Sequence, residues 1–287
     1  MNLKITDVRV QPGDSAFLLD DGVTSILYDS GFAFTGYALA DKIRSILGDR
    51  QLDYIFLTHS HYDHALGSVY IKARYPSVKL VAGEYAAEVF DRPTARAVMR
   101  ELDRKHAAHL GVFQYEDRID ELQVDITVRD GDMINAGDMV FSVVALPGHT
   151  KCSVGFYLES ERLLLSTETL GVYDGRDIVV PSFLVGYQMT RDSIAKVRSM
   201  GVGQFLLPHY GLLEADKTAF YLAECDKNAE LTAEQITEIL KKGGSYEDAV
   251  TWFRDTYYSG RIQPLYPEAA MLMNTNIMVR LIEQELL

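Results

Sequence analysis

Three histidines and an aspartate directly follow a short apolar run, and this stretch constrains the fold more than any other part of the chain. The run covers residues 54–57, and the cluster is His59, His61, Asp63 and His64. Imidazole nitrogens and carboxylate oxygens are ligands that zinc, iron and manganese share. On an extended segment His59 and His61 point the same way, whereas Asp63 and His64 lie past the bend. The pattern therefore predicts a strand that delivers two groups of ligands to two metal ions.

Short apolar runs separated by turn residues occupy most of the chain before residue 212. These runs predict strands, and the apolar spacing over residues 65–75 predicts a helix that Pro76 ends. Residues 84–109 also favour helix, which we expect to cover one side of a cleft or to form a flap. Residues 54–82 thus contain a predicted strand, helix, strand unit. The predicted strands lie within residues 2–28 and at residues 54–57, 78–82, 124–128, 139–146, 154–158, 162–166 and 205–207.

Further candidate ligands follow three later strands. His149 comes after a Pro-Gly bend, Glu168 follows one strand, and His209 follows another. A lone histidine is usually structural, but the cluster upstream favours a ligand role for each of these residues. His106 and His109 are neighbours on one face of a predicted helix. No other ligand lies near them in the sequence, so we expect a surface or packing role for both.

Together these residues resemble the metallo-β-lactamase superfamily, whose signature is His-x-His-x-Asp-His followed by a distant Gly-His, an acid and a final His. The resemblance covers roughly residues 2–211. It implies a four-layer αββα sandwich of the α/β class, with the metals along one edge between two sheets. It also implies that His59, His61 and His149 hold one ion, that Asp63, His64 and His209 hold the other, and that Glu168 takes the place of the bridging acid.

Glu168 departs from the family pattern, in which the bridging acid is aspartate. The extra methylene adds about 1.5 Å of reach. The bridge is therefore either kept with a shifted backbone or lost, and a glutamate exposed after a strand is the plain alternative. Asp29 and Gly31 match the short Asp-x-Gly turn that supports the metal loops in the family.

The expected function is that of a hydrolase with two divalent metal ions, zinc first, with iron or manganese as alternatives. Two cations ~3.5–4 Å apart can share a water and hold it as a bridging hydroxide. Asp63 is the expected catalytic residue, because it would ligate one ion and orient the hydroxide. We expect a small ester, thioester or lactone as substrate. The alternatives are a regulatory or ligand-binding protein with little hydrolysis, and a phosphodiesterase.

Helical periodicity replaces the strand pattern after residue 212. This change predicts two domains, a metallo-β-lactamase-like domain over residues 1–212 and a helical extension over residues 213–287. Thr232 with Gln235, and Ser245 with Asp248, suggest capping boxes at two helix starts. The extension is similar to those of glyoxalase II and of the subgroup that contains the quinolone-signal response protein, where helices roof the active site. A packing or homodimer face is the alternative.

Two tyrosines lie in an apolar segment beside the candidate ligands. Tyr173 and Tyr187 are candidates for donating a hydrogen bond to a substrate oxygen, and a core position is the alternative for each. Cys152 lies three residues after His149. We expect it to be buried and inert, because no further histidine is placed to activate it.

The composition of the chain indicates which binding partners and which cellular compartment to expect. The formal net charge of −13 disfavours nucleic acid and anionic membrane surfaces as partners, which need concentrated basic surface. The chain has only two cysteines and no apolar stretch of the length of a membrane span. We therefore expect a cytoplasmic protein that acts on a small molecule.

Overall fold

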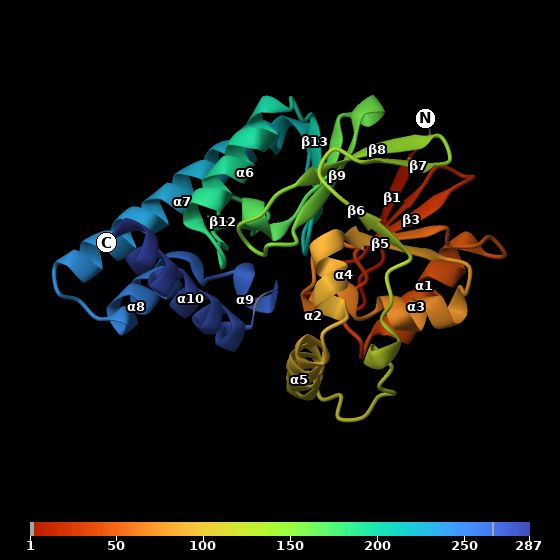
Figure 1. Ribbon diagram of the computed structural model, residues 1–287, viewed down its shortest axis with the longest axis horizontal. Coiled ribbons are helices and arrows are strands. Elements are labelled where there is room, and N and C mark those ends of the chain that lie inside the picture. Colours follow the sequence, from red (N-terminus) through yellow and green to blue (C-terminus); the bar gives the residue numbers. More distant parts are fainter. Residues whose placement is uncertain (1–2, 266) are drawn as a thin grey trace. The chain divides into compact units, whose positions relative to one another are not determined.

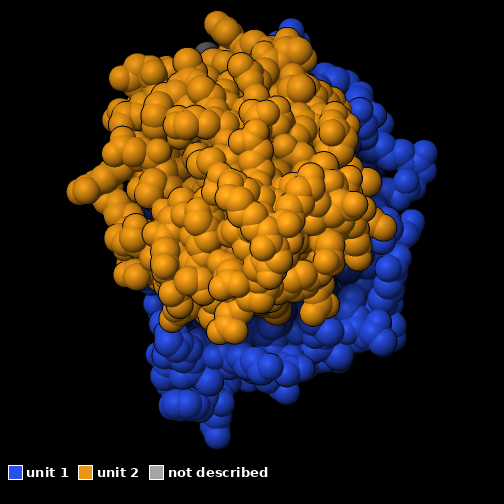
Figure 2. Space-filling model, turned by 90° about the vertical axis from the view of Figure 1, so that its left-hand side faces the viewer, with its two compact units in different colours: residues 1–145, 154–160 blue, residues 146–153, 161–287 orange. Residues whose placement is uncertain are grey.

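The computed structural model describes residues 3–265 and 267–287 (Figure 1). The chain forms two compact units (Figure 2). Unit 1 consists of residues 1–145 and 154–160, and unit 2 of residues 146–153 and 161–287. The chain thus enters unit 2 briefly, returns to unit 1 for one strand, and then completes unit 2.

One sheet of unit 1 has the strand order β1-β2-β3-β4-β5-β6. The strands β1, β2 and β3 pair antiparallel, whereas the strands from β3 to β6 pair parallel. Leu27 lies opposite Ile55, which lies opposite Leu80, and all three are fully buried. Continuous apolar strands of this kind are typical of a parallel sheet. The strands are β1 (Lys4–Asp7), β2 (Phe17–Asp20), β3 (Ser25–Tyr28), β4 (Tyr54–Phe56), β5 (Lys79–Gly83) and β6 (Ile126–Val128).

Unit 1 also contains helices and an antiparallel set of strands. In α1 the residues Leu39, Ile43 and Leu47 are buried, at the spacing of one helix face. The strands β7, β8 and β9 pair antiparallel in chain order. The elements are α1 (Gly36–Leu47), α2 (Tyr62–Ala65), α3 (Ser68–Arg74), α4 (Glu84–Phe90), α5 (Pro93–His109), the 3-10 helix Ile119–Glu121, β7 (Met133–Ala136), β8 (Met139–Ala145) and β9 (Val154–Leu158).

The helix predicted over residues 65–75 is confirmed as α3, Ser68–Arg74, but it begins later than predicted, because Gly67 separates it from the short helix α2. A Cβ atom on Gly67 would lie 1.8 Å from the backbone oxygen of Ser30. The amide of Gly67 donates to the oxygen of Gly31 at 3.0 Å. The backbone at this break is therefore packed directly against the Asp29–Gly31 turn.

Unit 2 joins short strands to a set of long helices (Figure 1). The strands β10 and β13 pair parallel, β13 and β14 pair antiparallel, and β11 and β12 form a hairpin. The elements are β10 (Leu163–Leu165), the 3-10 helix Glu168–Leu170, β11 (Val172–Tyr173), β12 (Val179–Val180), α6 (Tyr187–Ser199), β13 (Gln204–Leu207), β14 (Gly211–Leu212), the 3-10 helix Ala215–Lys217, α7 (Thr218–Lys241), α8 (Tyr246–Tyr257), α9 (Ile262–Leu265) and α10 (Glu268–Leu286).

Of the two capping boxes suggested for the helical region, one forms and the other does not. Ser245 and Asp248 form the complete box at the start of α8. Thr232 instead lies inside α7, fully buried, with its hydroxyl 3.1 Å from the hydroxyl of Tyr257. The predicted break there is therefore wrong, because Thr232 faces α8 rather than a helix end. α7 packs against α6 and β12 as well as α8 and α10.

The α/β class and the helical C-terminal region are confirmed. The domain boundary expected after residue 212 stays a prediction. Across residues 3–265 and 267–287, no helix combines the length and the apolar character that crossing a membrane requires.

Candidate metal centre

Unit 1 carries the histidine cluster at the carboxyl end of β4. His61 has an extended backbone and is followed at once by α2, which begins at Tyr62. The ring centroid of His59 lies 4.6 Å from that of His61 and 4.0 Å from that of His64. The Nε2 atom of His64 lies 3.6 Å from Oδ2 of Asp63. The predicted bend therefore occurs between the two pairs of ligands, and all four side chains gather within unit 1.

Asp29 supports this cluster through hydrogen bonds. It is fully buried, and its Oδ1 accepts hydrogen bonds from the amide and hydroxyl of Thr58 at 2.9 and 3.0 Å. Its Oδ2 lies 2.8 Å from Nδ1 of His64 and accepts a hydrogen bond from Ser15 at 2.8 Å. A carboxylate on Nδ1 fixes the imidazole tautomer that presents Nε2 to a metal.

Unit 2 carries the other three candidate ligands. His149 is 2% exposed, and its Nδ1 lies 2.8 Å from Oγ and 2.9 Å from the backbone oxygen of Ser182. Its Nε2 lies 2.7 Å from Oε2 of Glu168. The other carboxylate oxygen, Oε1, lies 3.0 Å from Nε2 of His209. One carboxylate thus turns one oxygen to each of two imidazoles.

The charge state of Glu168 follows from these neighbours. Burial opposes ionisation, but the imidazoles of His149 and His209 outweigh it and hold the pKa of Glu168 well below its usual value. The plain alternative, an exposed glutamate after a strand, does not describe this buried side chain.

Two site residues have left-handed backbone conformations. Asp29 has a φ of 53° and His209 a φ of 61°. Positive φ is uncommon for residues other than glycine, and such conformations cluster at functional sites. Asp29 directly follows β3 and His209 lies two residues after β13, so the chain turns sharply close to the end of each strand.

The donors in both units have the chemistry that a divalent metal requires. The histidines whose Nδ1 atoms are held by Asp29 and Ser182 present Nε2 as the ligand atom. Carboxylate oxygens of Asp63 and Glu168 lie beside such nitrogens. Neutral imidazole with carboxylate suits zinc, iron and manganese. The residues present therefore fit divalent metal ions.

The tyrosines predicted as substrate contacts have partners within unit 2. Tyr173 is 1% exposed and donates its hydroxyl to the backbone oxygen of Arg176 at 2.8 Å. Tyr187 accepts a hydrogen bond from Arg191 at 3.0 Å and packs on Phe183. These contacts favour the packing alternative, and the substrate role of both residues stays a prediction.

Three further side chains that the sequence singles out, His106, His109 and Cys152, have the surface or packing positions expected for them. The ring of His106 stacks on Phe32 at 4.4 Å, and burial lowers the pKa of His106. His109 is exposed at the end of α5. Cys152 is buried, with its sulfur 3.2 Å from the hydroxyl of Thr150.

The hydroxyl residues that hold the ligands could not be predicted from the sequence pattern. Ser15 and Ser182 lie 14 and 33 residues from their partners, Asp29 and His149, so no local pattern identifies them. Thr169 directly follows Glu168, and its hydroxyl accepts a hydrogen bond from the amide of His149 at 3.2 Å. Adjacency to a ligand was the available signal in that case.

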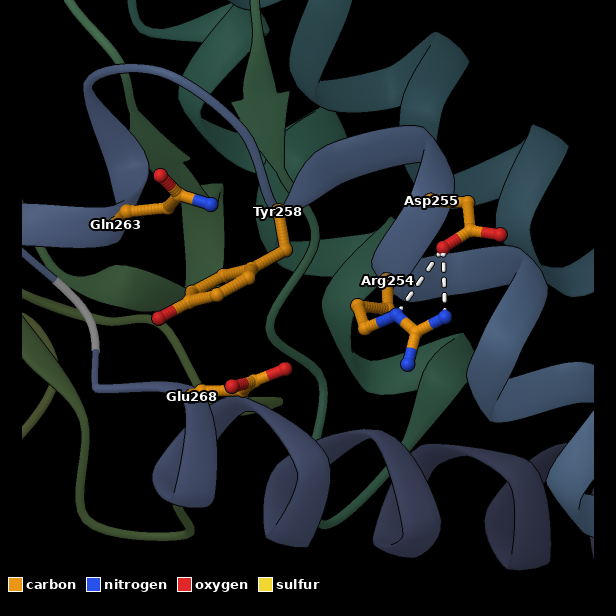
Figure 3. Close-up of a pocket in the computed structure, with 5 residues that line it drawn as sticks. All are labelled: Arg254, Asp255, Tyr258, Gln263 and Glu268. Atoms are coloured by element: carbon orange, nitrogen blue, oxygen red, sulfur yellow. Dashed lines mark hydrogen bonds and ion pairs between the residues drawn. The ribbon is translucent and has the colours of Figure 1, made fainter.

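A polar hollow of about 460 Å³ lies elsewhere in unit 2, where α8 ends and α10 begins. Figure 3 shows the Tyr258 ring between the side chains of Gln263 and Glu268. Burial, together with the Glu268 carboxylate, raises the pKa of Tyr258. Arg254 is paired with Asp255 at 2.9 Å. The described lining residues include no histidine or cysteine, so this hollow lacks the donor set of the candidate metal centre.

Comparison with known proteins finds a matching family and several similar proteins. The sequence profile of the Metallo-beta-lactamase superfamily matches residues 12–209. A "Glyoxylase B2" from Dictyostelium discoideum is 27% identical over 128 residues, which are 44% of this chain and 39% of that protein. A "Hydroxyacylglutathione hydrolase" from Francisella tularensis subsp. holarctica is 31% identical over 120 residues, 42% of this chain and 34% of that protein. An "Acyl-coenzyme A thioesterase MBLAC2" from Bos taurus is 25% identical over 167 residues, 56% of this chain and 57% of that protein.

These matches span between about a third and three fifths of the relatives' own length. Two solved structures cover more of the chain. A metallo-beta-lactamase family protein from Thermus thermophilus has a TM-score of 0.63 at 17% identity, covering 99% of this chain and 94% of that one. An archaeal metallo-beta-lactamase superfamily protein from Sulfolobus tokodaii has a TM-score of 0.60 at 19% identity, covering 78% and 84%. These likenesses concern the fold alone, and they confirm the expected fold class.

Proposed function

The chain belongs to the metallo-beta-lactamase superfamily, and from this premise we propose that it is a metal-dependent hydrolase of a small thioester. The observation that carries the proposal is the carboxylate of Glu168, whose two oxygens face His149 and His209. In the proposed assignment these two histidines belong to different metal ions. A carboxylate with one oxygen toward each is the arrangement that a bridging ligand needs.

The proposed ligand sets draw on both units. Zinc is the metal we expect first, with iron or manganese as alternatives. When bound, a pair of such ions supplies Lewis acidity and lowers the pKa of a water to near neutrality. His59, His61 and His149 are proposed for one ion, Asp63, His64 and His209 for the other, and Glu168 for both.

Glu168 keeps the bridging role in this proposal despite its extra methylene. The side chain is buried, and its carboxylate reaches both imidazoles from the 3-10 helix Glu168–Leu170. This supports the first of the two alternatives that the longer side chain leaves open, a bridge retained with an adjusted backbone.

Asp63 is the proposed catalytic residue. It lies in the first turn of α2, beside His64, and its side chain is 21% exposed, so a water can reach it. We propose that its carboxylate accepts a hydrogen bond from the attacking water and orients the water toward the acyl carbon. Attack then breaks the bond between acyl carbon and sulfur and releases a carboxylic acid and a thiol. No separate protein base is needed.

A thioester is preferred over the other acyl substrates because of the names of two relatives, an acyl-coenzyme A thioesterase and a hydroxyacylglutathione hydrolase. Esters and lactones belong to the same reaction class. The net charge of −13 supports a small molecule over nucleic acid as the partner. A cytoplasmic location and a homodimer remain part of the proposal.

The test combines metal analysis with a substrate panel. Protein purified without oxygen should contain about two divalent ions per chain. It should hydrolyse acyl-coenzyme A or S-acylglutathione esters faster than simple esters, lactones or phosphodiesters. Asp63→Asn should abolish turnover, whereas Asp255→Asn, which alters an exposed carboxylate in α8, should not. Full metal content without turnover of any substrate would contradict the hydrolase function and favour a ligand-binding role, and turnover of phosphodiesters alone would favour a phosphodiesterase.

A further inference from the structure

A single buried hydroxyl joins the two segments of unit 2 that carry His149 and Glu168. Thr169 is 1% exposed. Its Oγ1 donates to the backbone oxygen of Leu146 at 2.6 Å and accepts from the amide of His149 at 3.2 Å. Its own amide donates to Oγ1 of Thr167 at 3.0 Å. A hydroxyl has one proton and two lone pairs, and here the proton and one lone pair serve the loop of residues 146–149.

The two segments are also in contact through their side chains. Oε2 of Glu168 lies 2.7 Å from Nε2 of His149, so the two segments meet both at the backbone and at the proposed ligand atoms. The packing between them leaves no spare room. A Cβ atom on Gly148 would lie 2.9 Å from Cγ2 of Thr169 and 2.1 Å from Oγ1 of Thr190. The separation of the two backbones is therefore set by this contact.

From this geometry we infer that Thr169 is a positioning residue that fixes how far the Glu168 side chain must reach. A glutamate extends about 1.5 Å further than an aspartate. The backbone at residue 168 must then sit at the distance from His149 that suits the longer side chain, and the Thr169 hydroxyl holds it there. This inference rests on the proposed metal function, because Thr169 acts through His149 and Glu168 rather than on a substrate.

Removing the hydroxyl while keeping the shape tests the inference. Metal-free protein is titrated with cobalt(II) and followed by its visible absorption. Thr169→Val should weaken the binding of at least one ion by about 10- to 100-fold, the usual loss when a partner of a metal ligand is removed. Thr169→Ser keeps the hydroxyl and should keep the parent affinity. Thr275→Val is the matched control, because Thr275 is also fully buried and donates its hydroxyl to Met271 within α10.

A second measurement needs no metal. Hydrogen exchange of the His149 amide should be faster in Thr169→Val than in the parent and in Thr169→Ser, by about five- to tenfold for one lost hydrogen bond. Thr169→Ala repeats both measurements if the valine variant does not fold.

Two results would overturn the inference: parent affinity and parent exchange in the variants without a hydroxyl, or an equal loss in Thr169→Ser. If the parent and the Thr275→Val control both fail to bind cobalt, the proposed metal function is wrong instead. The exchange measurement still decides then whether Thr169 holds the His149 loop.

Discussion

At the scale of single residues, the charge and the length of Glu168 make separable contributions. Glu168→Gln keeps the length and removes the charge, so metal content should fall from about two ions per chain to one or fewer. Glu168→Asp keeps the charge but withdraws the carboxylate by about 1.5 Å, so one of the contacts to His149 and His209 should be lost. We expect an intermediate metal content for the aspartate variant. Elemental analysis after gel filtration measures both.

An exposed glutamate provides the control for this pair of variants. Glu238 lies on the surface of α7 and pairs with Lys242, so Glu238→Gln should leave the metal content unchanged. A Glu168→Gln variant that still holds two ions would show that the carboxylate does not bridge.

Asp103 makes the stability of unit 1 depend on pH. It is fully buried in α5, where it accepts hydrogen bonds from the amide of Ala33 and the hydroxyl of Tyr115. Burial raises the pKa of Asp103 from 3.8 to about 6, although these hydrogen bonds oppose the change. The folded chain therefore binds more protons than the unfolded chain between these pH values. The free energy of unfolding must decrease as pH rises through that window.

The variant Asp103→Asn should remove this dependence. Relative to the variant, the parent should lose about 2 kcal/mol of unfolding free energy between pH 4 and pH 7, at about 1.4 kcal/mol per pKa unit and with the unfolded carboxyl already partly deprotonated at pH 4. Urea unfolding at several pH values measures the difference. Parallel curves for the parent and the variant would mean that Asp103 titrates normally in the folded chain.

The candidate ligands of the histidine cluster could be predicted from the sequence, because their placement depends on local spacing. His59 and His61 share a face because they are two apart on an extended segment, and Asp63 and His64 follow in a helical turn. Ser182 has no such signal, because its hydrogen bond to His149 exists only once distant segments have packed. Local pattern therefore identified the candidate ligands and missed most of the residues that orient them.

At the scale of elements, packing decided where helices begin and end. Thr232 and Gln235 have the residue types of a capping box, yet α7 continues through them because the Thr232 hydroxyl finds a partner on α8. Ser245 and Asp248 have no such alternative and form the cap. Gly67 gives the opposite case, in which helical spacing continues but the backbone contact with Ser30 separates α2 from α3. Propensity is a weak guide wherever a buried partner competes with it.

The break at Gly67 supports the metal loop. Because a Cβ would lie 1.8 Å from the oxygen of Ser30, Gly67→Ala should destabilise the chain by at least about 3 kcal/mol. It should also disturb His64, whose backbone oxygen accepts hydrogen bonds from the amide and hydroxyl of Ser30. Urea unfolding and metal content measure the two effects. Gly203→Ala is the control, since the nearest atom to its Cβ would be the Cβ of Arg162 at 3.1 Å. An equal loss of stability in that variant would refute the explanation.

At the scale of the whole molecule, the residues proposed as metal ligands are distributed over both compact units. Unit 1 contributes four of the proposed ligands and unit 2 contributes three. The division did not follow from the sequence, because residues 146–153 belong to unit 2 while residues 154–160 return to unit 1. From the sequence pattern, such short segments would be grouped with the residues next to them in the chain. The pairing of β9 with β8 instead groups residues 154–158 with unit 1.

In the proposed assignment, metal binding should raise the stability of the folded chain. A ligand that binds only the folded state adds about 2.7 kcal/mol at a free concentration 100 times its Kd. Metal-loaded protein should therefore unfold at a higher temperature than chelator-treated protein. Calorimetry of both forms measures this, and Glu168→Gln should show a smaller difference between them. An unfolding profile that chelation leaves unchanged would contradict the binding of metal by the folded chain.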